Sequence, residues 1–415
     1  MHSEKSAYLI AYSGGLDSHV LLHLFATIAK EHPEITLRSI YIDHGLQEAS
    51  VAWLDHCQQI ADTLHIECLS TSLHLKIPKG ESLEAVARKV RYQAIGKQLR
   101  ENEVLLTAHH QDDQAETLLL QLLRGAGLDG LAAMPLKSNF AKSEHLRPLL
   151  NYSREQLEEY AKKHELNFIT DPSNKEDRFD RNFLRNSVIP MMKQRWPQMG
   201  QTLSRSATLQ AEASQLQASY LNDEIFELSG SREATLSSSA ITALPLIKQK
   251  AVLRHWIKQS GFKMPSAKKL QHVMGDVLNS KLDAMPLVEW KGAEIRRYGD
   301  DVYIMSPQLD LSPSRALDWD ISGSLDLGEN LPTLNPNDLG DLKTILLEQG
   351  VPVTVRFRQG GERIRLRNRQ CTIALKKLLQ EERIPPWQRD RVPLVFAGDQ
   401  LISVWGLAQI DKKNL

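Results

Sequence analysis

The chain has 415 residues, of which 41% are hydrophobic and 25% are charged, and its 51 Lys and Arg are balanced by 51 Asp and Glu. This length exceeds one compact core, so we expect two or three domains, and the composition excludes a disordered, collagen-like or membrane-embedded chain. Three cysteines without a Cys-x-x-Cys pair argue against a disulfide framework, structural zinc and iron–sulfur clusters. Since there is no charged-then-apolar leader and no long apolar run, a cytoplasmic protein without membrane contact is predicted.

Charge is unevenly distributed along the chain. Residues 351–415 contain 13 Lys and Arg against 6 Asp and Glu, a balance of +7 that leaves −7 for the first 350 residues. Such an asymmetry is typical of a catalytic body joined to a module that binds a polyanion.

Apolar runs and amphipathic stretches alternate through the first 125 residues. The runs, expected to be strands, begin at Ala7, Leu37, Ile66 and Val104, and helical spacing is found over 19–30, 51–64, 83–99 and 113–124. This alternation predicts an α/β fold whose doubly wound, mostly parallel sheet is covered by helices on both faces. Ligands bind such a sheet at the carboxyl ends of its strands, so the chemistry should lie there.

The pattern changes at Ser153, where Ser153-x-x-Gln156 predicts a capping box and a helix through Lys163. Further on, helical patterns predominate to about 280, short strands are expected between 287 and 305, and residues 306–337 are rich in Pro, Ser, Asp and Gly. The last part predicts a small strand-rich domain with one helix at Thr372–Glu381. We therefore expect a catalytic domain at 1–205, a largely helical middle domain at 206–305, a linker at 306–345 and a small, basic α+β domain at 346–415.

A glycine-containing turn, Tyr12-Ser13-Gly14-Gly15-Leu16-Asp17-Ser18, lies between the first expected strand and helix. Backbone N–H groups in a tight turn and at a helix start form an anion site, and the two glycines permit conformations closed to other residues. Ser13 and Ser18 add hydroxyl donors, and the carboxylate of Asp17 suggests a ligand for Mg²⁺ bridging nucleotide phosphates. A plain strand-to-helix turn is the alternative, and Gly-Gly alone would leave it open.

The turn lacks the Lys-Ser/Thr ending of the kinase P-loop and is not G-x-G-x-x-G. It resembles the Ser-Gly-Gly-x-Asp-Ser signature of the PP-loop, or N-type, ATP pyrophosphatases. That resemblance implies an adenine nucleotide alpha hydrolase-like fold that cleaves ATP between its α and β phosphates. It implies ATP binding by the turn and by the end of the second strand, at Ser13, Gly14, Gly15, Leu16, Asp17, Ser18, Asp43 and His44. For Asp43 and His44 a simple turn after a strand is an equal alternative.

A second acidic segment, Thr107-Ala108-His109-His110-Gln111-Asp112-Asp113-Gln114-Ala115-Glu116-Thr117, leads from the fourth expected strand into a helix. Asp113 and Glu116 are three residues apart, so they share a face of the first helical turn and should face the ATP site. Asp-x-x-Glu at a helix start is also a capping box, but two histidines and three acids exceed what a cap needs. A metal site here is conceivable, and carboxylates suit Mg²⁺ better than zinc.

Together with Ala87-Arg88 and Arg91-Tyr92, this segment resembles the tRNA(Ile)-lysidine synthetase family. Further matches are Asp171-Pro172-Ser173-Asn174, Arg181-Asn182-x-x-Arg185, Lys376-Lys377 and Ile384-Pro385-Pro386-Trp387. The resemblance implies ATP-dependent ligation of L-lysine to the wobble cytidine of tRNA(Ile) with a CAU anticodon, through an adenylated cytidine. ATP and Mg²⁺ are the implied cofactors, the tRNA and lysine are the implied partners, and a homodimer stays open.

Roles for the catalytic residues follow from this resemblance. Asp17 would position Mg²⁺, and Asp113 and Glu116 would bind the ammonium groups of lysine, one of them accepting a proton. Arg88 and Arg91, also three apart on a helix, would hold nucleotide phosphates or the AMP leaving group, with a solvated basic face as the alternative.

Two basic regions are expected to bind tRNA. Arg178, Arg181 and Arg185 have the spacing of a stripe along one helix face. In the C-terminal domain the expected contacts are Arg358, Arg363, Lys376 and Lys377, and Trp387 could stack on a base, although a core Trp is the alternative. The middle domain is also assigned to the tRNA, although residues 210–340 contain no recognisable motif.

Three rival functions remain. The first is a tRNA thiolase on the same fold, which would need paired or catalytic cysteines. The second is an amidoligase for a small metabolite, which would not need the basic C-terminal region. The third is a tRNA-binding protein with an inactive ATP site, which would not need the intact turn and the two acids.

Overall fold

The computed structural model describes residues 6–43, 45, 50–73, 83–172, 176–281, 284–308, 316–328, 331–366 and 371–411. The chain divides into two compact units, Met1–Tyr220 and Leu221–Leu415. Within the described ranges, every helix is too short or too polar to cross a membrane.

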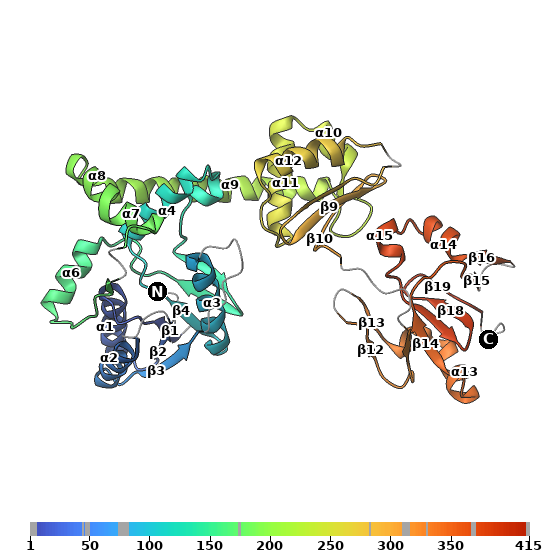
Figure 1. Cartoon of the computed structure of the whole chain (residues 1–415), viewed down its shortest axis with the longest axis horizontal. Coiled ribbons are helices and arrows are strands. Elements are labelled where there is room, and N and C mark those ends of the chain that lie inside the picture. The colour runs from blue at the N-terminus through green and yellow to red at the C-terminus, as the bar shows by residue number, and fades with distance from the viewer. Residues whose placement is uncertain are drawn as a thin grey trace. The chain divides into compact units, whose positions relative to one another are not determined.

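A six-stranded sheet in the order β3-β2-β1-β4-β6-β5 forms the centre of the first unit (Figure 1). Its strands are β1 (Ala7–Ala11), β2 (Thr36–Asp43), β3 (Glu67–Ser72), β4 (Glu103–Leu106), β5 (Lys137–Phe140) and β6 (Ser143–Leu146). Neighbouring strands are parallel except in the β5–β6 hairpin at the edge. The predicted α/β fold with a mostly parallel sheet is confirmed. The hairpin was not predicted, because the polar sequence Lys-Ser-Asn-Phe of β5 gives no strand signal.

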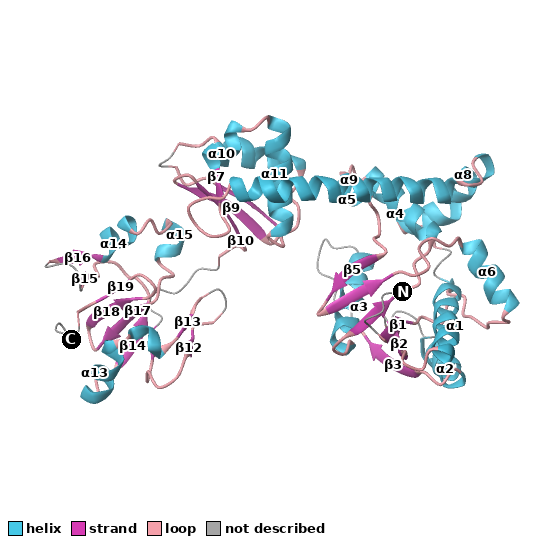
Figure 2. Cartoon of the chain, turned by 180° about the vertical axis from the view of Figure 1, so that it is seen from behind, coloured by secondary structure: helices cyan, strands magenta, loops and turns pink. Residues whose placement is uncertain are grey.

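Both faces of this sheet are buried, which explains the uninterrupted apolar run of β1. Tyr8 and Ile10 pack with residues of α1 (Leu16–Glu31) and α2 (Ser50–Thr63), whereas Leu9 and Ala11 pack with Ile95 of α3 (Leu83–Gln98). Figures 1 and 2 show α1 and α2 on one side of the strands and α3 on the other. Successive side chains of a strand point to opposite faces, so each face receives its own apolar set.

The chain continues beyond the sheet as a series of helices. They are α4 (Gln111–Leu123), α5 (Leu128–Leu131), α6 (Arg154–Lys163), α7 (Asp180–Phe183), the π-helical segment η2 (Leu184–Val188), α8 (Ile189–Arg195) and α9 (Met199–Glu227). The predicted capping box of α6 is confirmed, because Ser153 N donates to Gln156 Oε1 at 2.9 Å and Gln156 N donates to Ser153 Oγ at 3.3 Å. At α4 the box is formed by His110 and Asp113 rather than by Asp113 and Glu116.

The second unit begins with helices packed on an antiparallel sheet of order β7-β10-β9-β8. Its elements are β7 (Leu236–Ser237), α10 (Ser238–Ala243), α11 (Leu246–Gln259), α12 (Ala267–His272), the π-helical η3 (Val273–Leu278), β8 (Leu287–Trp290), β9 (Ala293–Tyr298) and β10 (Asp301–Met305). One buried apolar cluster joins α11, η3 and β9. The short strands expected between 287 and 305 are present.

The last part of the second unit contains a five-stranded sheet of order β11-β14-β17-β18-β19. Its elements are β11 (Ala316–Asp318), β12 (Leu325–Asp326), β13 (Thr333–Leu334), the 3₁₀ helix η4 (Pro336–Leu339), α13 (Asp341–Gln349), β14 (Val353–Arg356), β15 (Arg363–Arg365), β16 (Thr372–Ala374), α14 (Leu375–Glu381), α15 (Pro386–Arg389), β17 (Leu394–Ala397), β18 (Gln400–Val404) and β19 (Ala408–Gln409). The helix expected at Thr372–Glu381 therefore begins only at Leu375, because Thr372–Ala374 pairs with β15.

The linker predicted at 306–345 is wrong over residues 316–328 and 331–345. Strand β11 pairs with β14, and Trp319, Leu327 and Leu342 are buried in the same core as β14 and β18. Isolated apolar residues in a Pro-, Ser- and Gly-rich stretch show no hydrophobic periodicity, so their burial could not be predicted from the sequence.

A buried ion pair joins β2 to β4 across the six-stranded sheet. Arg38 of β2 donates to both carboxylate oxygens of Glu103 of β4, at 2.8 Å and 2.6 Å, and to the carbonyl of Gln98 at 2.9 Å. Burial alone would raise the pKa of Glu103, but the hydrogen bonds from Arg38 and from the Arg100 backbone outweigh it and lower that pKa. Because the folded pKa is depressed, this stabilisation is present above the pKa of the unfolded carboxyl and is lost as pH falls through the folded value.

We predict that Glu103→Gln lowers the free energy of unfolding by about 3 kcal/mol, because it leaves the Arg38 guanidinium buried without a counter-charge. Glu67→Gln, which breaks the exposed pair of Glu67 with Arg100, is the matched control and should cost under about 1 kcal/mol. Urea denaturation at neutral pH measures both. Equal losses for the two variants would contradict a special role for the buried pair.

Candidate active site

The turn after β1 is held in shape by one glycine and one serine. Gly14 has φ +78°, a backbone conformation that favours glycine, whereas Gly15 has φ −75° and ψ 165° and is the N-cap of α1. The expectation that both glycines need special conformations is thus wrong for Gly15. Ser18 closes the turn, since its Oγ accepts from Ser13 N at 3.2 Å and donates to Gly15 O at 3.0 Å.

A distant segment supports this turn from outside. Ile169 N donates to Gly14 O at 2.9 Å, and Gly15 and Ile169 form a parallel bridge. A methyl group added at Gly14 would lie 2.7 Å from Cδ1 of Ile169 and 3.0 Å from Sγ of Cys57. Gly14 is therefore required by space as well as by φ.

A cavity of about 510 Å³ opens beside the turn, at the carboxyl ends of β1, β2 and β4. Of the residues expected to bind ATP, those that line it are Ser13, Gly15, Leu16, Asp17, Ser18 and Asp43. His44 lies outside the described residues. The cavity is also lined by residues that sequence reasoning missed, namely Trp53, Arg154, Phe168, Ile169 and Thr170. These come from three separate segments, so no local pattern could have identified them.

Arg91 of α3 also lines this cavity, and it makes no hydrogen bond or ion pair with any other described residue. Burial lowers its pKa, and the neighbouring Arg88 adds to the effect. Arg88 instead lies over the ring of Tyr92, with its guanidinium carbon 5.4 Å from the centroid. A half-buried guanidinium without a counter-ion is suited to bind an anionic ligand.

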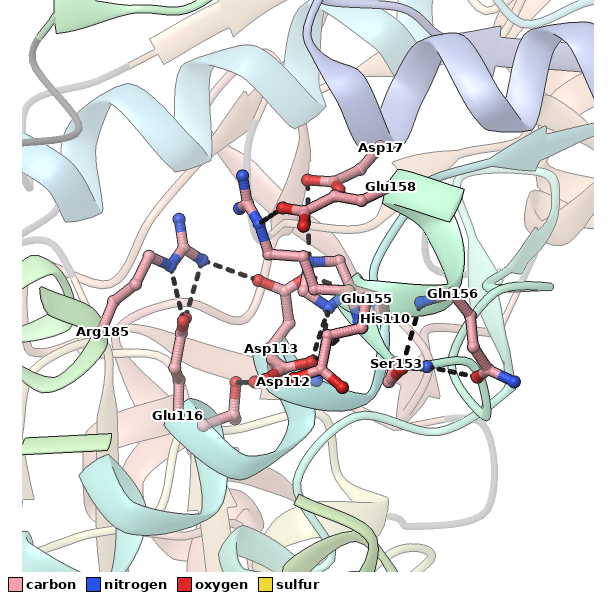
Figure 3. Close-up of polar contacts among 12 residues, drawn as sticks. Asp17, His110, Asp112, Asp113, Glu116, Ser153, Glu155, Gln156, Glu158 and Arg185 are labelled. Atoms are coloured by element: carbon pink, nitrogen blue, oxygen red, sulfur yellow. Dashed lines mark hydrogen bonds and ion pairs between the residues drawn. The ribbon is translucent and has the colours of Figure 1, made fainter. Parts of the chain in front are cut away.

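The paired acids of α4 are bound by two arginines, of which Figure 3 labels Arg185. Arg185 donates to both oxygens of Glu116, at 2.6 Å and 2.9 Å, and to Asp113 Oδ1 at 2.9 Å. Arg181 donates to Glu116 Oε2 at 2.7 Å and to Asp113 Oδ1 at 2.9 Å. Burial would raise the pKa of Asp113, but His110 and the arginines outweigh it and lower that pKa to about 2. Both acids share one helix face, as their spacing predicted, but neither is among the residues that line the cavity beside the turn.

His110 lies between Asp17 and Asp113 (Figure 3). Its Nε2 is 3.6 Å from Asp17 Oδ2 and 3.4 Å from Asp113 Oδ2, which is within ion-pair range but not hydrogen-bonded. Burial lowers the pKa of His110, yet the carboxylates of Asp17, Asp113 and Asp112 more than offset this and raise it overall. His110 therefore couples the acids of α4 to the first turn of α1.

The expected basic stripe at Arg178, Arg181 and Arg185 is not formed. Arg181 and Arg185 turn inward to the acids of α4, and only Arg178 is well exposed, paired with Glu176 at 2.7 Å. Residues at spacings of three and four share a helix face, but spacing does not say whether that face is turned to solvent or to buried acids.

The expected C-terminal contacts have mixed environments. Arg363 on β15 and Lys376 and Lys377 on α14 are exposed, whereas Arg358 pairs with Asp390 at 2.9 Å. Trp387 is packed among Tyr298, Tyr303 and Arg296. It is not offered to solvent as a stacking platform.

One carboxylate fits a magnesium ion. Oδ1 of Asp17 is buried and has no hydrogen-bond partner among the described residues. Mg²⁺ in nucleotide enzymes is commonly held by one or two carboxylates, phosphate oxygens and water. The described residues contain no group of three or more His, Cys, Asp or Glu that could hold a metal without such a ligand. Asp17 therefore suits an ion that arrives with a nucleotide.

The cysteines do not supply a reactive thiolate near the turn. Cys57 is buried against Gly14, and burial raises its pKa to about 12. Burial also raises the pKa of Cys68. Thiols that stay protonated are poor nucleophiles, which argues against a thiolase.

A larger cavity, of about 760 Å³, lies in the second unit beside Trp405 and Leu407. Asp338 and Glu382 contribute carboxylates to its lining, which disfavours a phosphate there.

Three family models match consecutive parts of the chain. They describe a PP-loop domain over residues 1–192, a TilS substrate binding domain over 236–303 and a TilS substrate C-terminal domain over 353–413. A tRNA(Ile)-lysidine synthase of Coxiella burnetii is 43% identical over 97% of this chain and 89% of its own length. One from Photorhabdus laumondii is 40% identical over 97% of this chain and 90% of its own. The chain belongs to the tRNA(Ile)-lysidine synthase family.

Among solved structures, a U34-tRNA thiolase from Methanococcus maripaludis, with its [4Fe-4S] cluster, has 15% identity and a TM-score of 0.44, covering 50% of this chain and 73% of that chain. This likeness is too low to carry an argument about function. The PP-loop fold of the lysidine synthase family agrees with the sheet and turn described above.

We predict that Gly14→Ala sharply reduces ATP binding, about 10-fold or more, because Cβ would displace Ile169 and strain φ. Gly15→Ala is the matched control, since its Cβ would approach no closer than 3.6 Å, to Ser13 Oγ. Calorimetric titration with ATP, alongside thermal unfolding, measures both effects. If the two variants bind equally well, the shape of the turn does not depend on Gly14.

Proposed function

We propose that this chain ligates L-lysine to the 2-carbon of the wobble cytidine of tRNA(Ile) with a CAU anticodon, at the expense of ATP, which changes the tRNA from methionine to isoleucine specificity. The observation that carries the proposal is the 510 Å³ cavity, which is lined by the anion-binding turn and by Arg91, a side chain with no counter-ion among the described residues. Arg185 also lines it and connects it to the paired acids, because it binds both Asp113 and Glu116. This cavity occurs in a chain of the lysidine synthase family. Because the substrate is a tRNA, we also propose a cytoplasmic location.

Two displacements account for the reaction. The 2-carbonyl oxygen of cytidine attacks the α-phosphorus of ATP, and the bond to pyrophosphate breaks. The ε-amine of lysine then attacks carbon 2, and the bond from that carbon to the AMP oxygen breaks as the amine loses a proton. Each step exchanges one bond for another, so no redox partner is needed.

The turn and Arg91 would hold the nucleotide. The first N–H groups of α1 have no partner within the helix and carry partial positive charge, so they favour phosphate oxygens. Arg91, which also lines the cavity, would neutralise the α-phosphate and stabilise AMP as it leaves. Asp43 and its neighbours at the end of β2 would contact the nucleoside, while Arg88, stacked on Tyr92, would act on the phosphates only through its charge.

Asp17 would hold Mg²⁺ through its partnerless Oδ1. The ion would supply charge neutralisation at the departing pyrophosphate. His110, whose Nε2 is 3.6 Å from Asp17 Oδ2, would help to hold this carboxylate beside the turn.

Lysine binding at Asp113 and Glu116 requires an exchange of partners. Arg181 and Arg185 now neutralise both acids, so an ammonium group can take their place only when an arginine withdraws. Phosphates of the tRNA are the strongest competing partners for a guanidinium. We therefore propose that tRNA phosphates bind Arg181 or Arg185 and separate it from the acids, which then bind lysine. Under this proposal the arginines contact tRNA and the acids contact lysine, as the sequence predicted for each.

Incubation of the full chain with radiolabelled lysine, ATP and a tRNA(Ile) transcript should fix the label on the RNA. We predict that Asp17→Asn lowers the rate of pyrophosphate release about 100-fold or more, because the nucleotide loses its metal ligand. Asp55→Asn, at an exposed position on α2, is the control and should leave the rate unchanged. Unaltered release by Asp17→Asn would remove the metal role. Sulfur transfer, or ATP turnover without RNA, would instead support a rival function.

An exposed basic face in the second unit would bind the tRNA backbone. On β15, Arg363 and Arg365 flank the buried Ile364, and on α14 the exposed Lys376 and Lys377 follow the buried Leu375. The pairing of β15 with β16, which leads directly into α14, brings these four cations into one region. Clustered cations with few internal partners are suited to phosphate contacts.

We predict that Lys376→Ala with Lys377→Ala weakens tRNA binding and reduces the slope of log affinity against log salt by about 1 per lysine, because each cation releases counterions from the RNA. Lys30→Ala with Lys97→Ala, at exposed positions on α1 and α3, is the matched control and should keep the slope. Filter binding across a salt series measures both. An unchanged slope in the α14 variant would reject the basic face as a tRNA contact.

A further inference from the structure

A chain of buried hydrogen bonds runs from the edge of the catalytic sheet to the cavity. Arg147 NH2 contacts His145 Nδ1 at 3.1 Å, His145 Nε2 contacts Thr107 Oγ1 at 2.7 Å, and Thr107 Oγ1 contacts His109 Nδ1 at 2.7 Å. Arg147, His145 and Thr107 are all buried, and His109 lines the cavity. None of the first three residues has a role in the mechanism above.

The sheet fixes the members of this chain in place. His145 of β6 lies opposite Leu105 of β4, and Thr107 N donates to Leu146 O at 3.1 Å just beyond. The guanidinium of Arg147 is held by a second hydrogen bond, from NH1 to Pro135 O at 2.7 Å. The backbone pairing of β4 with β6 therefore fixes the positions from which these side chains form their hydrogen bonds.

The direction of every hydrogen bond follows from chemistry. A guanidinium only donates, so Nδ1 of His145 must accept, and the proton of the neutral ring must sit on Nε2. That N–H donates to Thr107 Oγ1. Among the described residues Thr107 Oγ1 has only the two histidines as partners, so its own hydrogen is satisfied only by donating to Nδ1 of His109. The proton of His109 is thereby placed on Nε2.

We propose that Arg147 is a positioning residue that, through His145 and Thr107, fixes His109 as the Nε2–H tautomer and so presents a neutral hydrogen-bond donor to a phosphate oxygen of the nucleotide in the cavity. Nε2 of His109 has no partner among the described residues, and Ser13 and Arg91 line the same cavity. The role toward the nucleotide rests on the proposed function, whereas the tautomer itself does not.

The electrostatics of the two histidines agree with this arrangement. Burial, with Arg147 and Arg88 adding to it, lowers the pKa of His145 to about 3. Burial also dominates at His109, where Arg147, Arg181 and Arg88 add to it, Asp113 opposes it, and the pKa falls to about 3. Both rings stay neutral at neutral pH, which makes His109 a donor that adds no charge.

Long-range ¹H–¹⁵N NMR of the full chain labelled with ¹⁵N-histidine tests the tautomer without substrate. The His109 signals, assigned by their loss in His109→Gln, should show a proton on Nε2 in the wild type. Thr107→Val, which removes the hydroxyl at nearly constant shape, should release His109 into a mixture of tautomers, and Thr107→Ser should restore the wild-type pattern. Arg147→Met should change the His145 and His109 patterns together. A proton on Nδ1 of His109 in the wild type, or no response to Thr107→Val, overturns the proposal.

Activity provides the second readout. Thr107→Val should lower kcat for pyrophosphate release about 10-fold or more with a smaller effect on KM, because a donor aimed at developing charge acts mainly in the transition state, and Thr107→Ser should recover most of it. An unchanged kcat in Thr107→Val overturns the role toward the nucleotide. If the wild type shows the expected tautomer but fixes no lysine on RNA, the proposed function fails instead.

Discussion

Charge compensation around the N-terminus of α4 is the constraint on which the catalytic unit depends. Asp112, Asp113 and Glu116 are largely withdrawn from water, and leaving such carboxylates unpaired would cost several kcal/mol each. Their partners come from residues far along the chain: Arg181 and Arg185 of α7 and η2, and Lys193 of α8, which contacts Asp112 at 2.7 Å. The acids thus select where the segment 180–195 docks.

Packing alone would not dock that segment firmly. Helix α7 has no buried residue, and η2 and α8 bury only Leu184 and Ile189. Arginine suits the task because its planar guanidinium binds two carboxylate oxygens at once, and Arg185 does so with Glu116 while also reaching Asp113. An anchor made of ion pairs, unlike one made of packed apolar side chains, can be released by a competing anion. The exchange of partners proposed for tRNA and lysine would depend on this property.

Local information explains what the sequence predicted well. The alternation of apolar runs and helical spacing, together with the Ser13–Ser18 turn between the first two elements, was sufficient for the first four strands, their parallel direction and the place of the cavity. The predictions that failed depended on contacts between distant segments. Ile169 donates a hydrogen bond to Gly14, which lies 155 residues earlier in the chain. The arginines of η2 and α7 bind acids that lie 65 to 72 residues earlier. Neither contact leaves a periodic signal, so the same arginine spacing fitted an exposed stripe equally well.

Two adjacent histidines mark two halves of the site, in which the net effect on the pKa of the ring has opposite sign. Burial, with Arg147, Arg181 and Arg88 adding to it, outweighs Asp113 and lowers the pKa of His109, whereas Asp17, Asp113 and Asp112 outweigh burial and raise the pKa of His110. The strand-to-helix transition at this point turns consecutive side chains in different directions, so one dipeptide serves both halves. Carboxylates near phosphates would repel them. The proposed function therefore assigns the nucleotide to the groups beside His109 and the lysine to the acids beside His110, once Arg181 or Arg185 has withdrawn from those acids. Under this proposal the neutral state of His109 matters as well, because a charged ring between the two halves would attract the nucleotide and repel the lysine.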